Sequence, residues 1–371
     1  MKTRKQWRTI AMTTAKTLRN KVVDDAKKYI GAKQGSKQHK HIIDVFNTVK
    51  PDGGAMTYTA YWCAAFASAI AIEALGKEYA KKYFPLSWSC ITIITKAKKL
   101  GIWKESDAYK PSPGDWLLYD WEDNGKGDCK GDPNHVGIVE KISKGSMTII
   151  EGNMRNAAGQ SVVGERTVAV NGKYIRGFVV PDYEKIAEVE NKRIEKEKQA
   201  KAKAHQKAIA DTAKKLAYPG RPDEARYPSG HPTKEFKKAL NDVYPNRKTW
   251  SDAPKKGASC DVFAGTVIRE SGVDPKFPRG LTDQIKYLEK SDKFELVTPR
   301  PAPSKMRDGD IIVYKKLNGG GHICIHVKGK VKHAQLKKWY GSTTNNLKTM
   351  LSMKNKKGKV YKKWIKVYRA K

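Results

Sequence analysis

The feature that most constrains this chain is a pattern of cysteine, Gly-Asp and histidine that occurs twice in its 371 residues. In each copy a cysteine opens an apolar run, a Gly-Asp step precedes an apolar strand-like segment, and a histidine begins the next such segment. The spacing is 52 residues from Cys63 to Asp115 and 50 residues from Cys260 to Asp310. The repeat therefore predicts two domains on one plan, and the chain is long enough for two cores.

The residues of this pattern suit nucleophilic catalysis. The apolar runs that follow Cys63 and Cys260 predict helices, so each cysteine lies at a helix N-terminus, where the pKa of a thiol is lowered. His135 and His322 begin predicted strands, from which an imidazole can hold the thiol proton and return it to a leaving amine. The sequence thus predicts chemistry on amide bonds in both halves.

Each half places its helices first and its strands afterwards, which is the order of an α+β domain. In the first half, a helix predicted from Cys63 to Leu75 and ending at Gly76 precedes short alternating runs typical of an antiparallel sheet. Residues 183–207 are rich in Lys, Glu and Ala, with opposite charges at helical spacing. We therefore expect domains at 1–182 and 208–371, joined by a charged helical linker at 183–207.

Glu151 and Asn153 are candidates for the third member of the first site. They end the strand that follows His135 and share a sheet face, from which either could hydrogen-bond the imidazole and fix its tautomer. Gly137 is expected to leave room beside His135 for a substrate or for the nucleophilic helix. Taken singly, such a cysteine is usually a small buried hydrophobe and such a histidine an ordinary strand-end residue. Their joint order favours a catalytic site.

The first half resembles the CHAP family of cysteine, histidine-dependent amidohydrolases/peptidases, which are papain-like domains of phage endolysins and bacterial wall hydrolases. The resemblance covers about residues 21–182. It implies Cys63 as nucleophile, His135 as base and later acid, and Glu151 with Asn153 as the residues that orient the histidine. Tyr58 and Tyr61 lie near the nucleophile, but the sequence assigns neither to the oxyanion. The matching segments are Trp62-Cys63-Ala64-Ala65-Phe66, Pro113-Gly114-Asp115, Asn134-His135-Val136-Gly137-Ile138-Val139 and Glu151-Gly152-Asn153.

The second half is similar to the NlpC-type wall peptidases in its Gly321-His322-Ile323-Cys324-Ile325 run and the following Val331-Lys332-His333-Ala334. This resemblance implies Cys260 as nucleophile, His322 as base and His333 as orienter. The chain departs from the family pattern because Asp261 follows the cysteine instead of preceding it. His326 shares a strand face with His322 and is the alternative base if the strand register differs. A second copy that only grips the substrate is a further alternative.

The two resemblances together imply a two-domain peptidoglycan hydrolase, either a phage endolysin or a virion-associated lysin. Such an enzyme would be an endopeptidase or an N-acetylmuramoyl-L-alanine amidase. The net charge of +36 would hold it on anionic wall polymers. The alternatives are a basic nucleic-acid- or envelope-binding protein with degenerate hydrolase domains, and a papain-like acyltransferase or toxin. No sequence-specific nucleic-acid binding is expected, because the basic residues lack recognition-module signals.

The sequence contains no apolar stretch long enough to cross a bilayer and no secretion signal at its basic N-terminus. We expect synthesis in the cytoplasm and action at the bacterial wall, after release through a holin or as part of a virion. The five cysteines are widely spaced and include no Cys-x-x-Cys pair, which disfavours a disulfide framework or structural zinc site. No cofactor is expected. The 120–128 segment resembles the start of a calcium loop but lacks the acidic twelfth ligand.

Overall fold

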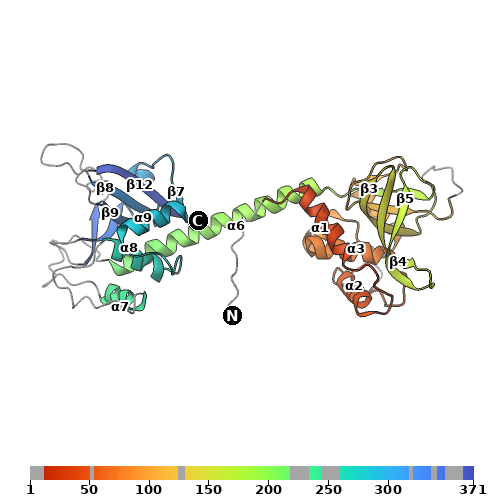
Figure 1. Ribbon diagram of the computed structural model, residues 1–371, viewed down its shortest axis with the longest axis horizontal. Helices are drawn as coiled ribbons and strands as arrows, with labels where there is room; N and C mark the ends of the chain where they lie inside the picture. Colours follow the sequence, from red (N-terminus) through yellow and green to blue (C-terminus); the bar gives the residue numbers. More distant parts are fainter. Residues whose placement is uncertain are drawn as a thin grey trace. The chain divides into compact units, whose positions relative to one another are not determined.

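The computed structural model describes residues 12–50, 54–123, 130–217, 234–243, 260–316, 321–335, 341–346 and 362–371. The chain divides into two compact units, Met1–Arg193 and Ile194–Lys371 (Figure 1). In both units helices precede an antiparallel sheet, so the predicted α+β class is confirmed.

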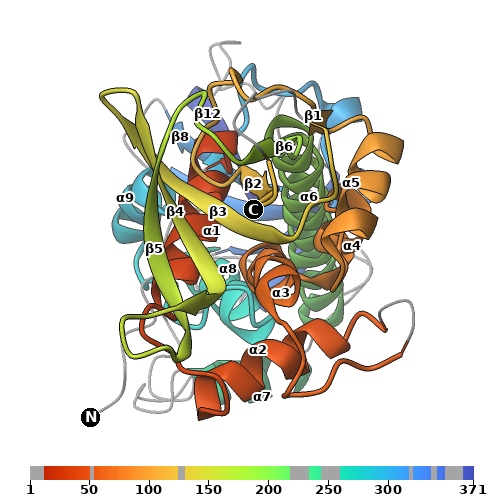
Figure 2. The same cartoon turned by 90° about the vertical axis from the view of Figure 1, so that its right-hand side faces the viewer.

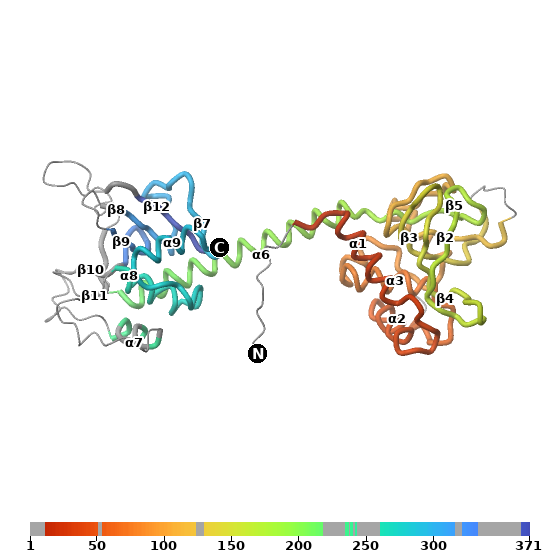
Figure 3. Tube along the Cα trace, in the orientation of Figure 1, coloured from red at the N-terminus to blue at the C-terminus, as the bar shows by residue number. Residues whose placement is uncertain are grey.

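The first unit begins with helices and ends with strands, as its sequence order predicts. Thr14 caps the first helix through a capping box with Thr17. Two helices that the sequence did not reveal, α2 and α4, flank the central α3. The helices are α1 (Ala15–Lys27), α2 (Lys37–Asn47), α3 (Cys63–Leu75), α4 (Lys77–Tyr83) and α5 (Cys90–Lys99). Figure 3 traces this path through the unit.

Helix α3 forms the centre of the first unit. It is apolar on nearly every side, and eleven of its thirteen residues are buried, which is the pattern of a helix enclosed by other elements rather than lying on a surface. It packs against β3 and β4 of the sheet and against α1 and α2 (Figure 2). A helix this enclosed holds its first residue, Cys63, in a fixed place beside the sheet.

Six strands form the sheet of the first unit in the order β1-β6-β2-β3-β4-β5. The central pair β2–β3 sets Tyr119 opposite His135. The next pair, β3–β4, sets Ile138 opposite Ile150. The strands are β1 (Trp103–Lys104), β2 (Trp116–Tyr119), β3 (His135–Ser143), β4 (Ser146–Arg155), β5 (Ser161–Ala169) and β6 (Ile175–Val179).

The second unit has its own core, in which α8 packs against the sheet strands β9 and β10. Its six strands follow the order β11-β10-β9-β8-β12-β7. The helices are α7 (Lys234–Val243), α8 (Cys260–Glu270) and α9 (Leu281–Lys290), with a 3₁₀ turn at Pro303–Lys305. The strands are β7 (Phe294–Leu296), β8 (Ile311–Lys316), β9 (Gly321–Val327), β10 (Lys330–Gln335), β11 (Gly341–Asn346) and β12 (Lys362–Ala370).

The segment expected to link the domains lies in one helix, α6 (Tyr183–Leu216). Its two ends are parts of different cores. Tyr183 and Ile186 are buried in the first unit, whereas Ile209 and Leu216 are buried in the second. Each unit therefore includes a segment of α6 as a structural element of its own.

The Gly-Asp step forms the same turn in both units. Gly114 and Gly309 have φ values of 86° and 85°, in the left-handed region that favours glycine. Asp115 and Asp310 are fully buried, and each accepts a hydrogen bond from the backbone N–H three residues earlier. Each aspartate also forms a salt bridge with an arginine: Asp115 with Arg19 at 2.7 Å, and Asp310 with Arg369 at 2.8 Å.

Each turn packs against the part of helix α6 that belongs to its own unit. A Cβ on Gly114 would lie 2.8 Å from the Tyr183 hydroxyl, and one on Gly309 would collide with the Gln206 carbonyl oxygen. The glycines therefore serve two purposes, since they permit the positive φ and let the turn approach the helix. Among the described helices, none combines the length and apolar character needed to cross a membrane.

Substitution of Gly114 tests this close approach. Gly31 has a similar φ of +88°, and a Cβ added there would have no other atom within 4 Å, so Gly31→Ala is a matched control for backbone strain alone. We expect Gly31→Ala to lower the free energy of unfolding by roughly 1 kcal/mol and Gly114→Ala by about 3 kcal/mol. Denaturant unfolding of the full chain measures both. An equal loss of unfolding free energy in the two variants would show that the close approach of Gly114 to Tyr183 does not contribute to stability.

Candidate active site

Cys63 is the first residue of α3, and 7% of its surface is exposed. Its N-cap residue, Trp62, makes no side-chain capping bond, so the first N–H groups of the helix remain available to a group at the helix start. The backbone N–H of Ala64 donates to the Cys63 sulfur. These groups and the helix dipole favour a thiolate at this position.

His135 and Glu151 form an ion pair between neighbouring strands. The imidazole Nε2 lies 3.1 Å from the Glu151 Oε2. Gly137 makes this contact possible, because a Cβ at that position would lie 2.7 Å from the Glu151 Cγ. The room that Gly137 leaves is therefore taken by the Ile149 and Glu151 side chains, not by substrate or the helix as the sequence suggested.

Glu151 is a fully buried carboxylate with three partners. Besides His135, the Tyr119 hydroxyl donates to its Oε1 at 2.6 Å and the Arg166 Nε to both oxygens at 3.0 and 3.1 Å. Burial acts to raise the pKa of Glu151, but the hydrogen bonds and charges of His135 and Arg166 outweigh it and hold the pKa below its usual value. The carboxylate is therefore ionised and fixed in orientation.

Three residues of this network were not found from the sequence. Tyr119 and Arg166 contact Glu151 directly, and Trp121 stacks on Tyr119 with ring centroids 4.5 Å apart. The Arg166 Cζ lies over the Trp121 ring, 5.0 Å from its centroid. The repeat contained a signal for Tyr119, because Tyr314 ends the corresponding apolar run and lies 5.3 Å from His322.

Hydrogen bonding from the Cys90 and His135 side chains sets the pKa of the Cys63 thiol. The bond from Cys90, together with the His135 bond and charge, lowers the pKa of Cys63 well below that of a free thiol despite burial. Burial acts to lower the pKa of His135, but Cys63 and Glu151 raise it to about 9. At neutral pH the pair is a thiolate and an imidazolium, the form that is ready for nucleophilic attack.

Asn153 has a different neighbour from the one predicted. Its Oδ1 accepts a hydrogen bond from the Ser161 hydroxyl at 2.7 Å, and Ser161 in turn accepts one from the Trp62 Nε1 at 3.0 Å. The amide oxygen of Asn153 is thus bonded to Ser161. The His135 ring is oriented by Glu151, while Asn153 lines the cleft beside the nucleophile.

A cleft of about 400 Å³ opens onto the thiolate. Of the two tyrosines near the nucleophile, Tyr61 lines this cleft, whereas the Tyr58 hydroxyl donates to Asp44 of α2. The lining residues are Tyr61, Cys63, Trp88, Ser89, Cys90, Ile91, Pro133, Asn134, Asn153 and Arg155. The cleft therefore combines aromatic walls, amide groups and one guanidinium around the sulfur.

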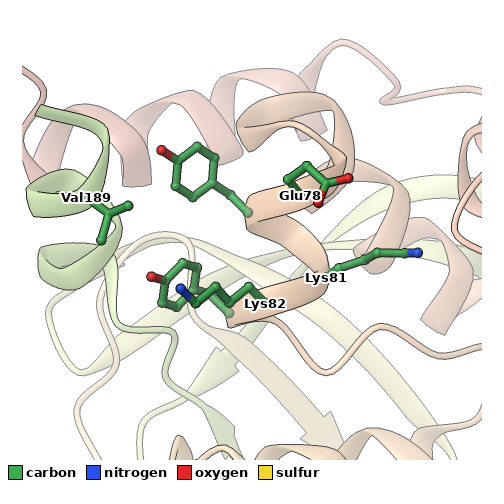
Figure 4. Close-up of a pocket in the computed structure, with 6 residues that line it drawn as sticks. Glu78, Lys81, Lys82 and Val189 are labelled. Atoms are coloured by element: carbon green, nitrogen blue, oxygen red, sulfur yellow. The ribbon is translucent and has the colours of Figure 1, made fainter. Parts of the chain in front are cut away.

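A second cavity of the first unit, of about 300 Å³, lies between α4 and the first part of α6 (Figure 4). It is lined by Glu78, Tyr79, Lys81, Lys82, Tyr83 and Val189. These described lining residues include no histidine and, unlike those of the cleft at Cys63, no cysteine.

The second unit places Cys260 at the same position, as the first residue of a helix packed on its sheet. Burial raises the pKa of this thiol to about 11, although the backbone N–H of Ile323 donates to it. Cys260 is thus a neutral thiol at pH 7, in contrast to Cys63. His322 is buried at the start of β9, opposite Tyr314, as His135 lies opposite Tyr119.

The two other histidines of the second site, His326 and His333, lie on β9 and β10. The His326 Nδ1 lies 2.9 Å from the Arg307 carbonyl oxygen and its Nε2 accepts from the Gly329 N–H at 3.0 Å, so this ring holds the β9–β10 turn. The side chain of His333 lies outside the described residues. By register, His333 follows Lys332, which pairs with Ile325. On the other side of β10, His333 pairs with Thr343 of β11.

The expected calcium-like loop falls largely on residues 124–129, outside the described part of the chain. At its start, the Asp120 Oδ1 accepts a hydrogen bond from the Glu122 N–H. Within the described residues, no group of three or more His, Cys, Asp or Glu side chains is placed to hold a metal ion. The described cysteines Cys63, Cys90, Cys260 and Cys324 are not in disulfides.

Comparison with known proteins confirms the resemblance of the first half. Residues 53–153 match the model of the CHAP domain, a segment that includes Cys63, His135, Glu151 and Asn153. The match indicates an amidase or peptidase activity on peptidoglycan. It does not extend to the second unit, whose NlpC-like character stays a prediction. No curated protein and no solved structure was found to match the chain.

The opposite pKa shifts of the two cysteines can be measured without a substrate. With iodoacetamide at pH 7, we expect Cys63 to be alkylated at least tenfold faster than Cys260, because only a thiolate reacts. The reaction at Cys260 should accelerate as the pH approaches the thiol pKa of about 11. Peptide mass spectrometry follows both sites in one sample. Equal rates at pH 7 would contradict the ion pair at Cys63.

Proposed function

We propose that the protein is a cysteine-dependent peptidoglycan hydrolase that cuts amide bonds in the stem peptides or cross-bridges of the bacterial wall. The observation that carries this proposal is the Cys63–His135–Glu151 arrangement at a cleft, within the segment that matches the CHAP domain. Both endopeptidase and N-acetylmuramoyl-L-alanine amidase activity fit this chemistry, since each breaks a bond between a carbonyl carbon and an amide nitrogen.

In the acylation step, the Cys63 thiolate attacks the carbonyl carbon of the substrate and forms an S–C bond. The carbonyl π electrons move to the oxygen, where the N–H groups at the start of α3 can stabilise the negative charge. The imidazolium of His135 then gives its proton to the leaving nitrogen as the C–N bond breaks. The products are a free amine and a thioester on Cys63.

In the deacylation step, His135 is neutral and takes a proton from water, whose oxygen attacks the thioester carbon. The C–S bond breaks, the carboxylic acid leaves, and the thiolate and imidazolium return. Glu151 holds the imidazole in one orientation throughout and stabilises its charged form. We assign to Asn153 a role beside the reacting carbonyl, because its amide oxygen is bonded to Ser161 and its amide nitrogen is left for the cleft that it lines.

The second unit is proposed to be an NlpC-like domain with Cys260, His322 and His333 in the corresponding roles. Its Gly-Asp turn and its Tyr–His strand pair support this assignment, because they repeat the first unit. The neutral Cys260 thiol favours a smaller share of catalysis for this copy. Gripping the substrate is the alternative role for this unit.

The positive charge supports a working place on a polyanionic surface. Lys and Arg outnumber Asp and Glu by 74 to 38 in the sequence, and anionic wall polymers would attract such a protein without a dedicated binding module. We propose a phage endolysin or virion-associated lysin made in the cytoplasm, with no cofactor requirement. A nucleic-acid-binding protein is disfavoured, since it would need neither the ion pair nor the open cleft.

Loss of turbidity of purified Gram-positive walls tests the proposal. We expect Cys63→Ala to remove most lysis, because the thiolate is the nucleophile, while Cys260→Ala leaves the greater part. The double variant Cys63→Ala/Cys260→Ala should be inactive, and mass spectrometry of the released fragments identifies the bond. Full lysis by the double variant would eliminate a cysteine mechanism.

Glu151→Gln tests the orienting role. We expect wall lysis to fall by roughly 10²-fold or more. In the wild type, activity should be lost as the pH rises through about 9, where His135 gives up its proton. This loss should move to lower pH in Glu151→Gln, because one cause of the raised pKa of His135 is removed.

Glu140→Gln is the matched control, since Glu140 is a buried carboxylate of β3 that pairs with Lys27 instead of the site. An equal fall in both variants, with no change in the pH profile, would show that Glu151 only supports the fold.

A further inference from the structure

Cys90 is a second thiol in the cleft at Cys63, and the mechanism proposed above gives it no role. Cys90 is the first residue of α5, as Cys63 is the first residue of α3. Both line the cleft, with 8% and 7% of their surfaces exposed. Each thiol also shifts the pKa of the other: Cys90 is the largest cause of the lowered pKa of Cys63, and Cys63 is the largest cause of the raised pKa of Cys90. The nucleophile therefore lies between an imidazole and a thiol.

Cys90 is held in place from two sides. The Ser89 side chain accepts from the Thr92 N–H and caps α5, which fixes the first turn of the helix. The preceding loop is tied to α3 by Ser68, whose hydroxyl donates to the Ser87 carbonyl at 3.1 Å and accepts from the Ser87 N–H at 3.2 Å. These bonds are buried, so the Cys90 thiol keeps a defined position relative to the helix that carries Cys63.

A hydrogen bond between these two sulfurs can have only one direction. The Cys63 thiolate has no proton to give, so the Cys90 S–H is the donor. The neighbouring thiolate and burial raise the pKa of Cys90 well above that of a free thiol, and Cys90 keeps its proton. Cys63 and Cys90 begin α3 and α5 and line the same cleft, and the dipole of α3 favours negative charge on the Cys63 sulfur.

We propose that Cys90 is a further catalytic residue, whose S–H donates a hydrogen bond to the Cys63 sulfur whenever that sulfur is negatively charged. This inference rests on the proposed function, in which Cys63 is the nucleophile. The bond is present in the resting thiolate and weakens in the thioester, where the sulfur is neutral. It forms again when the C–S bond breaks and the electron pair returns to Cys63. Cys90 keeps its proton throughout and assists the thiolate as the leaving group of deacylation.

The titration of Cys63 tests the hydrogen bond in the full chain, under a reducing agent. The rate of iodoacetamide reaction at Cys63 is measured against pH by peptide mass spectrometry, for the wild type, Cys90→Ala and Cys90→Ser. We expect Cys90→Ala to raise the midpoint by on the order of one pH unit, because a hydrogen bond to a charged group is lost. Cys90→Ser retains a donor and should keep the midpoint within about half a unit of the wild type.

Ile94→Val is the control for a merely structural effect, because Ile94 is a buried residue of α5 that does not line the cleft. It should leave the midpoint unchanged. The inference is overturned if Cys90→Ala titrates like the wild type, or if Ser and Ala variants shift equally.

Wall lysis separates the inference from the proposed function. Cys90→Ala should lower the steady-state rate and make acyl-enzyme on Cys63 accumulate, as detected by intact mass, while Cys90→Ser restores turnover. A shifted titration with no slower deacylation would overturn the leaving-group role. Failure of the wild type itself to lyse walls, with the titration shift intact, would reject the peptidoglycan substrate and not the Cys90 bond.

Discussion

The buried charge of Glu151 is the constraint on which the first unit's site depends. A fully buried carboxylate is costly unless charged or hydrogen-bonding groups surround it, and here His135, Tyr119 and Arg166 do so. These partners come from three different strands, so the sheet must form before the charge is satisfied. Gly137 supplies the space, because a Cβ there would lie 2.4 Å from the Ile149 Cγ2 and 2.7 Å from the Glu151 Cγ. The orientation of the His135 imidazole is thus a consequence of how the sheet accommodates one ionised group.

The two units show how one framework can give two different thiols. Both place a cysteine at the start of a buried helix and a histidine opposite a tyrosine on neighbouring strands. In the first unit, Cys90 and His135 stabilise the anion at Cys63. At Cys260 burial dominates and the thiol stays protonated. The helix position alone therefore does not produce a thiolate, and the side-chain partners decide the outcome.

The sequence predicted most of what depends on local patterns. The apolar run after Cys63 gave the correct bounds for α3, and the apolar segment after the Gly114-Asp115 step corresponds to β2. Helix α2 was missed because only Ile42, Ile43 and Phe46 show its buried face among polar residues. The histidine and its glutamate were placed correctly on neighbouring strands. The contacts of Cys90 with Cys63 and of Asn153 with Ser161 depend on tertiary packing, which no spacing in the sequence encodes.

Helix α6 has a consequence for how such proteins could be reassembled in evolution. The match to the CHAP domain ends at residue 153, yet the first core is completed by Tyr183 and Ile186, and the second by Ile209 and Leu216. A recombination junction at the motif boundary would leave the Gly114 turn without its helical support. The shortest inheritable module of the first unit therefore extends into α6, and exchange of catalytic modules would be tolerated best at a junction inside that helix.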